Sequence, residues 1–456
     1  MKKKFISLFL TAVMATSLLA GCGNSGTTAP AESKPAETPA AATEEAKAET
    51  TPAESTAAAE TTAESGSADY SGVTLTMWSM WNSTEPQGQV IQEAADAFKE
   101  KTGATINIEW KGRDINTIIQ AALESNEKID IFEDDYSRIA KNYKDYCYDL
   151  TDMAKAANYD ATSYACFNEV ATEWAGFLPC VTEQPQVGGV FYNQDIFDDC
   201  GISVPTTWDE FLDCCQKIKD AGYDPITVDD AYQQSMYGHY LAMIKDVDWV
   251  GELLTDKTGK LWDDPAILQM AEDFQELREK GYFAKSVGSN VFPAAQNGEF
   301  AMGTAAMYYN GSWLPNEVAE ITGDDFQWGA MFFPAPEGSK YPYTTYTTGC
   351  QFYGVNKDCE HPEEAVALLA EFTSVKTQQA LADEAQCIPV INGITLPDNL
   401  VCVGELMEES TDAFVWGGSN LEDADVRAII NASFTKLLAG DIDAPKFVEE
   451  IKSQLK

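Results

Sequence analysis

The feature that most constrains the fold is an alternation of strand and helix patterns where the apolar part of the chain begins. Residues 73–77, 105–110 and 129–132 have the apolar patterns of strands. Between them, residues 90–98 and 115–123 place apolar side chains on one face of a helix. A β-α-β-α-β order is typical of a parallel sheet with right-handed crossovers, so the predicted fold class is α/β. In such sheets, ligands bind beyond the carboxyl ends of the strands.

The rest of the chain is predicted to be mainly helical, with two short parallel-type sheets in all. One helix is predicted from Pro265 to Lys280, and two more in residues 426–437 and 447–455. The chain has 456 residues, which exceeds the roughly 250–300 at which single cores stop growing, so two lobes are expected.

The chain is strongly acidic, with 30 Lys and Arg against 73 Asp and Glu and a formal net charge of −43. A phosphate backbone requires a basic stripe, so this charge excludes nucleic-acid binding. His239 and His361 are the two histidines, too few for a histidine-rich metal site, and no metal or cofactor is expected. The charge also disfavours anionic ligands, although a local field can override it.

The N-terminus has the pattern of an export signal. Lys2, Lys3 and Lys4 precede an apolar run, residues 5–20, that is short for a membrane span but typical of a signal-peptide core. The run ends in Leu-Ala-Gly before Cys22, which resembles a bacterial lipobox. Residues 1–21 are therefore predicted to be a lipoprotein signal peptide, with acyl chains on Cys22. The alternative is an ordinary cleaved signal followed by an incidental Cys.

A polar segment of low complexity follows the signal. Residues 23–70 contain almost only Ala, Thr, Glu, Pro, Ser and Gly, with Tyr70 as the one aromatic residue. Such a segment buries too little apolar surface to offset its ordering entropy. We predict that residues 22–70 are a disordered acidic tether and that the protein is extracytoplasmic and anchored to the cell membrane.

Ten cysteines follow Cys22. An exported chain permits disulfides, but no CxxC pair or regular spacing indicates a framework. Small buried thiols are at least as good an interpretation, and no pairing is assigned.

Several segments, taken in order, resemble one family: the extracellular solute-binding lipoproteins of ABC importers, in the sugar-binding group that is similar to maltose-binding protein. The resemblance runs from about Val73 to the C-terminus. The segments that carry it are residues 75–78, 130–132, 190–197, 201–208, 306–313 and 437–440.

This resemblance implies two α/β lobes, each with a small sheet flanked by helices, joined by a hinge that the chain crosses more than once. Lobe I would comprise residues 71–185 and 346–396, and lobe II residues 186–345 and 397–456. It also implies a monomer that captures a carbohydrate between the lobes and delivers it to an ABC permease and its ATPase.

A sugar presents an apolar ring face and a rim of hydroxyls, so its site needs flat aromatic rings together with carboxylates or amides. Trp78, Trp81 and Asn82 follow the first strand, and Glu133 and Asp134 follow the third, where a ligand would lie. Acids are so abundant that only position distinguishes this pair.

Other candidates come from the resemblance. Glu183 matches a ligand-contact carboxylate of the family, and Trp313 matches its stacking aromatic residue. Gln233 lies in a segment that contributes contacts from lobe II. Gln351 comes shortly after a glycine, Trp416 comes directly before two glycines, and both are further candidates. Four other tryptophans are assigned to packing: Trp208, Trp249, Trp262 and Trp328.

Other functions stay open at this point. A receptor of the same fold for a polyamine would also use an acidic, aromatic cleft. A secreted glycoside hydrolase needs two facing carboxylates, whereas the sequence offers adjacent acids such as Asp263 and Asp264, which point to opposite faces of a strand. No nucleophile elbow, phosphate loop or HExxH motif is present, so the protein is expected not to be an enzyme. An adhesive surface lipoprotein is the third alternative.

Overall fold

The computed structural model describes residues 68–156, 165–289, 294–391, 393–419 and 421–455. The predicted signal peptide, Cys22 and almost all of the predicted tether lie outside these residues. Within the described residues, no helix combines the length and the apolar composition needed to cross a membrane.

Within the described residues, nine strands form one mixed sheet. The strands are β1 (Thr74–Ser79), β2 (Thr105–Trp110), β3 (Ile131–Asp135), β4 (Cys180–Asn193), β5 (Asp224–Thr227), β6 (Ala305–Gly311), β7 (Trp328–Met331), β8 (Thr345–Val355) and β9 (Asp412–Val415).

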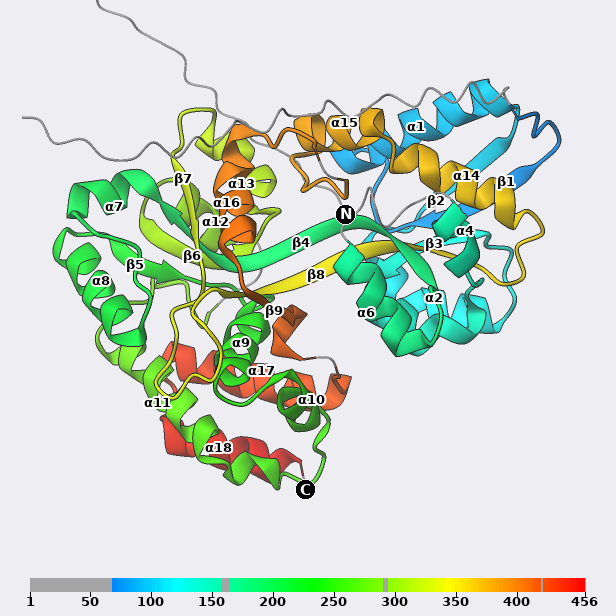
Figure 1. Ribbon diagram of the computed structural model, residues 1–456. Coiled ribbons are helices and arrows are strands. Elements are labelled where there is room, and N and C mark those ends of the chain that lie inside the picture. Colours follow the sequence, from blue (N-terminus) through cyan, green and yellow to red (C-terminus); the bar gives the residue numbers. More distant parts are fainter. Residues whose placement is uncertain (1–67, 157–164, 290–293, 392, 420, 456) are drawn as a thin grey trace, which may run out of the picture. The chain divides into compact units, whose positions relative to one another are not determined.

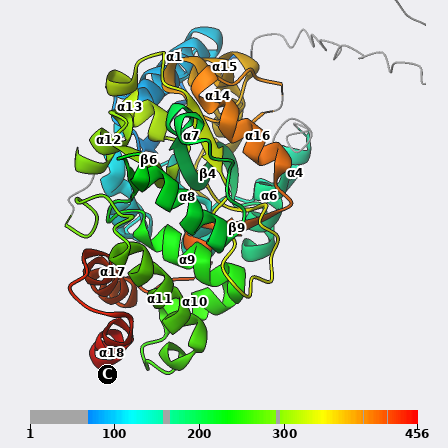
Figure 2. The same ribbon diagram turned by 90° about the vertical axis from the view of Figure 1, so that its left-hand side faces the viewer.

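Helices cover both faces of this sheet (Figure 1; Figure 2 gives the view from the side). The longer helices are α1 (Pro86–Thr102), α2 (Ile115–Glu124), α6 (Ala165–Ala175), α8 (Trp208–Asp220), α9 (Gln233–Ile244), α10 (Val247–Thr255), α11 (Pro265–Glu279), α12 (Ala294–Ala301), α13 (Leu314–Thr322), α14 (Pro362–Phe372), α15 (Val375–Ala385), α16 (Val401–Glu409), α17 (Ala424–Ala439) and α18 (Ala444–Gln454). Shorter ones are α3 (Tyr136–Arg138), α4 (Thr151–Ala156), α7 (Gln194–Cys200), a π-helical turn (Ile139–Tyr143) and 3-10 turns at Gly112–Asp114, Lys144–Tyr146, Leu261–Asp263, Asp398–Leu400 and Trp416–Gly418.

The order of the sheet is β2-β1-β3-β8-β4-β6-β5, with β7 paired to β4 and β9 to β8. β1 is parallel to β2 and β3, which confirms the predicted β-α-β-α-β unit. β4 and β8 pair antiparallel and run side by side through the centre (Figure 1). The prediction of two separate sheets is corrected here. The 14-residue β4 and the 11-residue β8 are long enough to pair with strands at both ends, so they join the two groups.

The apolar cores divide between the two groups of strands. We call lobe I the part built on β1, β2 and β3, and lobe II the part built on β5, β6 and β7. In lobe I, one core lies against α1 and α14 and another against α2 and α6. In lobe II, the larger core includes α8, α9, α11, α17 and α18, and a smaller one lies under α12, α13 and α16. β4 and β8 contribute to cores in both lobes.

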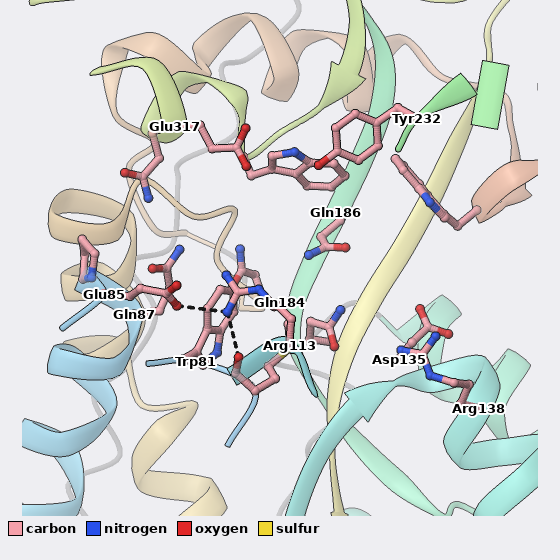
Figure 3. A pocket seen from close by; sticks show the side chains of 16 residues that line it. Trp81, Glu85, Gln87, Arg113, Asp135, Arg138, Gln184, Gln186, Tyr232 and Glu317 are labelled. Atoms are coloured by element: carbon pink, nitrogen blue, oxygen red, sulfur yellow. Dashed lines mark hydrogen bonds and ion pairs between the residues drawn. The ribbon is translucent and has the colours of Figure 1, made fainter. Parts of the chain in front are cut away.

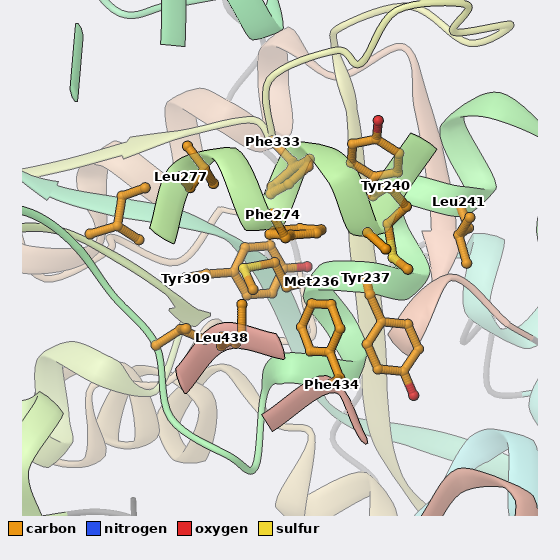
Figure 4. Packing of buried hydrophobic residues seen from close by; sticks show 14 of the residues in the cluster. Met236, Tyr237, Tyr240, Leu241, Phe274, Leu277, Tyr309, Phe333, Phe434 and Leu438 are labelled. Carbon is orange, nitrogen blue, oxygen red and sulfur yellow. The ribbon is translucent and has the colours of Figure 1, made fainter. Parts of the chain in front are cut away.

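Aromatic residues dominate the larger core of lobe II, where α9, α11 and α17 meet (Figure 4). The buried tyrosines there hydrogen-bond through their hydroxyls: Tyr237 donates to Asn431 Oδ1 at 2.9 Å, and Tyr309 donates to the Ser235 carbonyl at 2.9 Å. Because a buried hydroxyl without a partner is costly, the first bond ties α9 to α17 and the second ties β6 to α9.

Local signals account for the helix positions. α11 confirms the helix predicted from Pro265, and the two tail helices are confirmed as α17 and α18. In α2, Ile118 is 39% exposed and does not belong to the buried face, in contrast to the prediction.

The tryptophans assigned to packing are in core contacts: Trp208 and Trp262 are buried, and Trp249 and Trp328 pack at core edges.

Nine cysteines of the described residues are free thiols, and seven of them are buried. Burial raises the pKa of the Cys180, Cys215 and Cys350 thiols well above the ordinary value, which keeps them protonated and unreactive. The interpretation as small buried side chains therefore fits these positions.

Candidate functional site

A cavity of about 500 Å³ opens between lobe I and lobe II, where the strand ends of lobe I face the start of α13 and the turn at Trp416–Gly418 (Figure 3). Its size is that of a small-molecule site. It is lined by Met80, Trp81, Glu85, Pro86, Gln87, Arg113, Asp135, Arg138, Gln184, Gln186, Tyr232, Trp313, Asn316, Glu317, Gln351 and Trp416.

On the lobe II side, a pair of glycines forms a flat floor for two tryptophan rings. Gly188 of β4 is paired with Gly311 of β6. A Cβ atom on Gly311 would lie 2.2 Å from the ring of Trp313, and one on Gly188 would lie 2.5 Å from the ring of Trp416. The rings can lie against the backbone only because these positions lack side chains.

Three aromatic rings form the wall above this floor. The ring centroids of Trp313 and Trp416 are 5.3 Å apart, and Tyr232 lies 5.3 Å from Trp313 and 6.5 Å from Trp416. The backbone N–H of Tyr232 donates to Asp229 at 3.0 Å, and Asp229 also accepts a hydrogen bond from Tyr308 Oη at 2.5 Å. The wall is therefore fixed by packing and by buried hydrogen bonds.

On the lobe I side, the side chain of Trp81 is held by a hydrogen bond to its indole N–H and by a cation–π contact with its ring. Its Nε1 donates to Glu183 Oε1 at 2.7 Å. The guanidinium of Arg113 lies 4.6 Å from its ring centroid, and Arg113 also donates to the Met80 carbonyl at 2.7 Å and to Glu85 Oε2 at 3.0 Å. These contacts hold both side chains in the wall of the cavity.

Two carboxyls lie buried behind Trp81. Glu133 is fully buried and accepts hydrogen bonds from Ser79 Oγ and from the Met80 backbone N–H, both at 2.7 Å. Glu183 is 3% exposed. Burial, and then the neighbouring charge of Glu183, raises the pKa of Glu133 well above its usual range, and burial raises the pKa of Glu183 to about 7.

Arg138 reaches the cavity from the short helix after β3. Its Nε donates to Asp134 Oδ1 at 2.9 Å, and Asp134 itself is buried. Asp135 caps that helix by accepting from the Ser137 N–H at 2.9 Å. Burial raises the pKa of Asp135, and Arg138 opposes the shift.

A second cavity of about 420 Å³ shares Asp135, Arg138 and Trp416 with the first. Hydroxyl, amide and charged side chains line most of it. Its other lining residues are Ser137, Lys141, Asn142, Ala231, Gln234, Ser235, Val415, Ser419, Leu421, Glu422, Ala424 and Arg427. Arg427 pairs with Glu422 at 2.8 Å, so this arginine already has a counter-ion.

Four of the predicted site residues come together in the first cavity: Trp81, Trp313, Gln351 and Trp416. The other six do not line either cavity, and each has a different position. The alternation of β1 turns Trp78 into the core of lobe I, where it is 3% exposed. Asn82 is exposed and donates to Glu85 Oε1 at 3.0 Å.

The remaining four are held by protein partners. Gln233 is buried and donates to Thr435 Oγ1 at 3.0 Å. Glu133 and Glu183 lie behind Trp81, and Asp134 lies behind Arg138. Direct ligand contact by these four stays a prediction, and their present contacts support cavity residues instead.

The sequence reasoning missed Arg113, Arg138, Tyr232 and Glu317. Arg113 and Arg138 each follow the carboxyl end of a strand by three residues, so the rule that pointed to Trp81 could have found them. Glu317 is an exposed residue, but burial of its carboxyl group raises its pKa to about 7.

Comparison with known proteins places this geometry in context. A family model described as bacterial extracellular solute-binding protein matches residues 93–401. The melibiose/raffinose/stachyose-binding protein MelE of Bacillus subtilis (strain 168) is 27% identical over 183 residues, which are 38% of this chain and 42% of that protein. The diacetylchitobiose binding protein NgcE of Streptomyces coelicolor is 28% identical over 31% of this chain and 30% of that protein. The chain thus matches less than half the length of these two relatives.

Solved structures match over a larger share of the chain. A chitin oligosaccharide binding protein has a TM-score of 0.68 and 20% identity, over 84% of this chain and 98% of that one. RafE in complex with raffinose has a TM-score of 0.66 and 18% identity, also over 84% and 98%. These likenesses confirm the predicted two-lobed α/β fold.

Proposed function

Because the chain belongs to the bacterial extracellular solute-binding protein family, we propose that it captures a carbohydrate between its two lobes and delivers it to an ABC importer. The observation that carries this proposal is the cavity between the lobes, with aromatic rings from both sides and four glutamines in its lining. The family is extracellular, so the protein acts outside the cytoplasm.

The cavity has the chemistry that a sugar requires. The faces of Trp313 and Trp81 offer apolar contact to the C–H face of a pyranose ring. Gln184, Gln186 and Gln351 offer amide donors and acceptors to hydroxyls. Trp81 comes from lobe I and Trp313 from lobe II, so a ligand that bridges both lobes favours the conformation in which they meet.

We propose that the ligand is an oligosaccharide that extends from the first cavity past Trp416 into the second. The two cavities share three lining residues, among them Trp416. The guanidinium of Arg138 is paired with Asp134, and that of Arg427 with Glu422. Because these charges are already compensated, the cleft is suited to a neutral ligand rich in hydroxyls.

A polyamine is a poorer fit to the same cleft. Glu85 and Asp134 are already paired with Arg113 and Arg138, so these two carboxylates offer a cationic ligand little uncompensated charge. An enzymatic role is not part of the proposal, since the relatives named above are binding proteins and the cavity fits a receptor that releases its sugar unchanged.

The remaining parts of the proposal concern assembly and anchoring. We propose that residues 1–21 are removed, that Cys22 carries the lipid, and that residues 22–70 tether a monomer to the membrane beside its permease and ATPase. The lobes would comprise residues 71–185 with 346–396, and residues 186–345 with 397–456.

A thermal-shift series tests the ligand class. The panel contains neutral saccharides of increasing length, from melibiose through raffinose and stachyose to chitin oligosaccharides, with spermidine and a hexose phosphate beside them. A ligand at about 100 times its Kd should add about 2.7 kcal/mol of stability, visible as a shift of several degrees. We expect shifts with neutral saccharides that increase with length until both cavities are filled.

Two results would contradict the proposal. A shift with spermidine alone would keep the fold and overturn the ligand class. A shift that is as large for melibiose as for raffinose and stachyose would confine the ligand to the first cavity.

A further inference from the structure

The two buried carboxyls behind Trp81 are joined to the cavity wall by a short chain of hydrogen bonds. Glu183 accepts from the indole of Trp81 at 2.7 Å, and Glu133 accepts from the Met80 N–H at 2.7 Å. Ser79 Oγ donates to Glu133 at 2.7 Å and accepts from the Trp81 N–H at 3.2 Å. Both the backbone and the ring of Trp81 are therefore positioned by this pair.

The position of Glu183 in its strand is unusual. The pairing of β4 with β8 shifts register between Thr182 and Gln184, so Glu183 has no partner in the ladder. Such a bulge re-aims a side chain and bends its strand. Here the bulge points a carboxyl at Trp81, on one of the two strands that connect the lobes.

Each carboxyl has one oxygen without a hydrogen-bond partner among the described residues. These are Glu133 Oε1 and Glu183 Oε2, and both are buried. Two ionised carboxylates placed side by side away from water repel each other strongly, and the usual solution is that they hold one proton between them. One proton held by the pair leaves a single negative charge in this buried site in place of two.

We propose that Glu133 and Glu183 share one proton and that this proton holds Trp81 in the wall of the cavity, so that ligand binding depends on pH. Glu183 and Glu133 are then positioning residues, which act on the ligand through Trp81. The raised pKa of both carboxyls agrees with this arrangement, because two interacting carboxyls lose their protons in separate steps and the later proton is held well above the usual pKa range of a carboxyl.

An arginine and two thiols face this pair of carboxyls. Arg113 stabilises the ionised forms of both carboxyls from the cavity side. The thiols of Cys350, on β8, and of Cys387, after α15, face Glu183, and burial raises the pKa of both, to about 12 for Cys387. Neither thiol competes for the proton near neutral pH.

Infrared difference spectroscopy of the protein without ligand tests the shared proton directly. At pH 7.5 the wild type should show the carbonyl stretch of a protonated carboxylic acid, and this signal should disappear at alkaline pH. Glu183→Gln and Glu133→Gln should each remove it. Glu317→Gln is the matched control, since Glu317 has a similarly raised pKa but lies on the other lobe. A signal that is absent from the wild type, or that only Glu317→Gln removes, would overturn the proposal.

The pH dependence of binding tests the coupling to Trp81, and this arm rests on the proposed function. With a saccharide that binds, the wild-type Kd should rise by up to about tenfold per pH unit above the upper pKa of the pair, because one proton is lost. In Glu183→Gln the amide can accept from Trp81 and donate to Glu133, so affinity at pH 9 should match that of the wild type at pH 7. Asp273→Asn removes a carboxyl with a raised pKa that lines neither cavity, so it should keep the wild-type slope.

The two arms separate the possible failures. If no saccharide binds, the proposed function fails while the infrared signal still decides the shared proton. If saccharides bind with the same pH profile in Glu183→Gln and in the wild type, both being folded by circular dichroism, the coupling is refuted and the proposed function stands.

Discussion

Replacing Trp313 by alanine is expected to weaken saccharide binding at least tenfold while the protein stays folded. Trp313 lies on the floor formed by Gly188 and Gly311 and contacts both Tyr232 and Trp416. Its removal takes away a stacking face and loosens the two neighbouring rings. A tenfold loss corresponds to about 1.4 kcal/mol, which is within what one aromatic contact and its buried area supply. Isothermal titration calorimetry measures the change.

Two further variants show whether the loss comes from the ring itself. Trp313→Phe keeps an aromatic face on the same floor and should recover part of the affinity. Trp249→Ala removes a half-buried tryptophan of α10 that lies under Lys245 and lines neither cavity, so it should lower stability but not affinity. Equal affinities of Trp313→Ala and the wild type would remove Trp313 from the site.

The local parts of this fold could be predicted from sequence because each depends on a short-range pattern. The unit from β1 to β3 follows from hydrophobic periodicity within about 60 residues, and α11 follows from a proline start and one apolar face. Long-range pairing has no such signal. Nothing in the pattern of β4 or β8 shows that each pairs at its two ends with different strands, and this is what joins the two sheets.

The site could be predicted in part for the same reason. The position beyond a strand end predicts Trp81, the adjoining glycines predict Trp416, and the resemblance to the family predicts Trp313. Which way a side chain points is set by finer geometry. Trp78 lies within β1 and faces the core, whereas Trp81 lies beyond its end.

Glu183 illustrates the limit most clearly. An uninterrupted strand would alternate its side chains regularly, and Glu183 would then have a fixed face. The register shift in β4 breaks that alternation and turns the carboxyl toward Trp81. A bulge of this kind has no reliable sequence signature. Ligand contact by Glu183 stays a prediction from the family resemblance, and its bond to Trp81 could not be read from the sequence.

Replacing Gly238 by alanine is expected to displace Trp416 and so to weaken binding. Gly238 lies in α9 against the turn that carries Trp416, and a Cβ atom there would be 1.8 Å from the carbonyl oxygen of Gly417. Gly417 and Gly418 have φ angles of 73° and 65°, in the left-handed region that favours glycine, so the turn cannot easily move aside. We expect a loss of about 1–3 kcal/mol of stability and at least a tenfold loss of affinity, because Trp416 is displaced from both cavities.

Gly298→Ala provides the matched control, since Gly298 also lies in a helix, α12, but its nearest neighbour to an added Cβ is the flexible end of Met302 at 3.6 Å. That substitution should leave affinity unchanged and raise stability by up to about 1 kcal/mol, the difference in helix propensity. Chemical denaturation and calorimetry on both variants separate the two effects. If Gly238→Ala binds saccharide like the wild type, then the contact between α9 and the turn does not position Trp416, and the continuity of the two cavities would have to depend on the glycine floor alone.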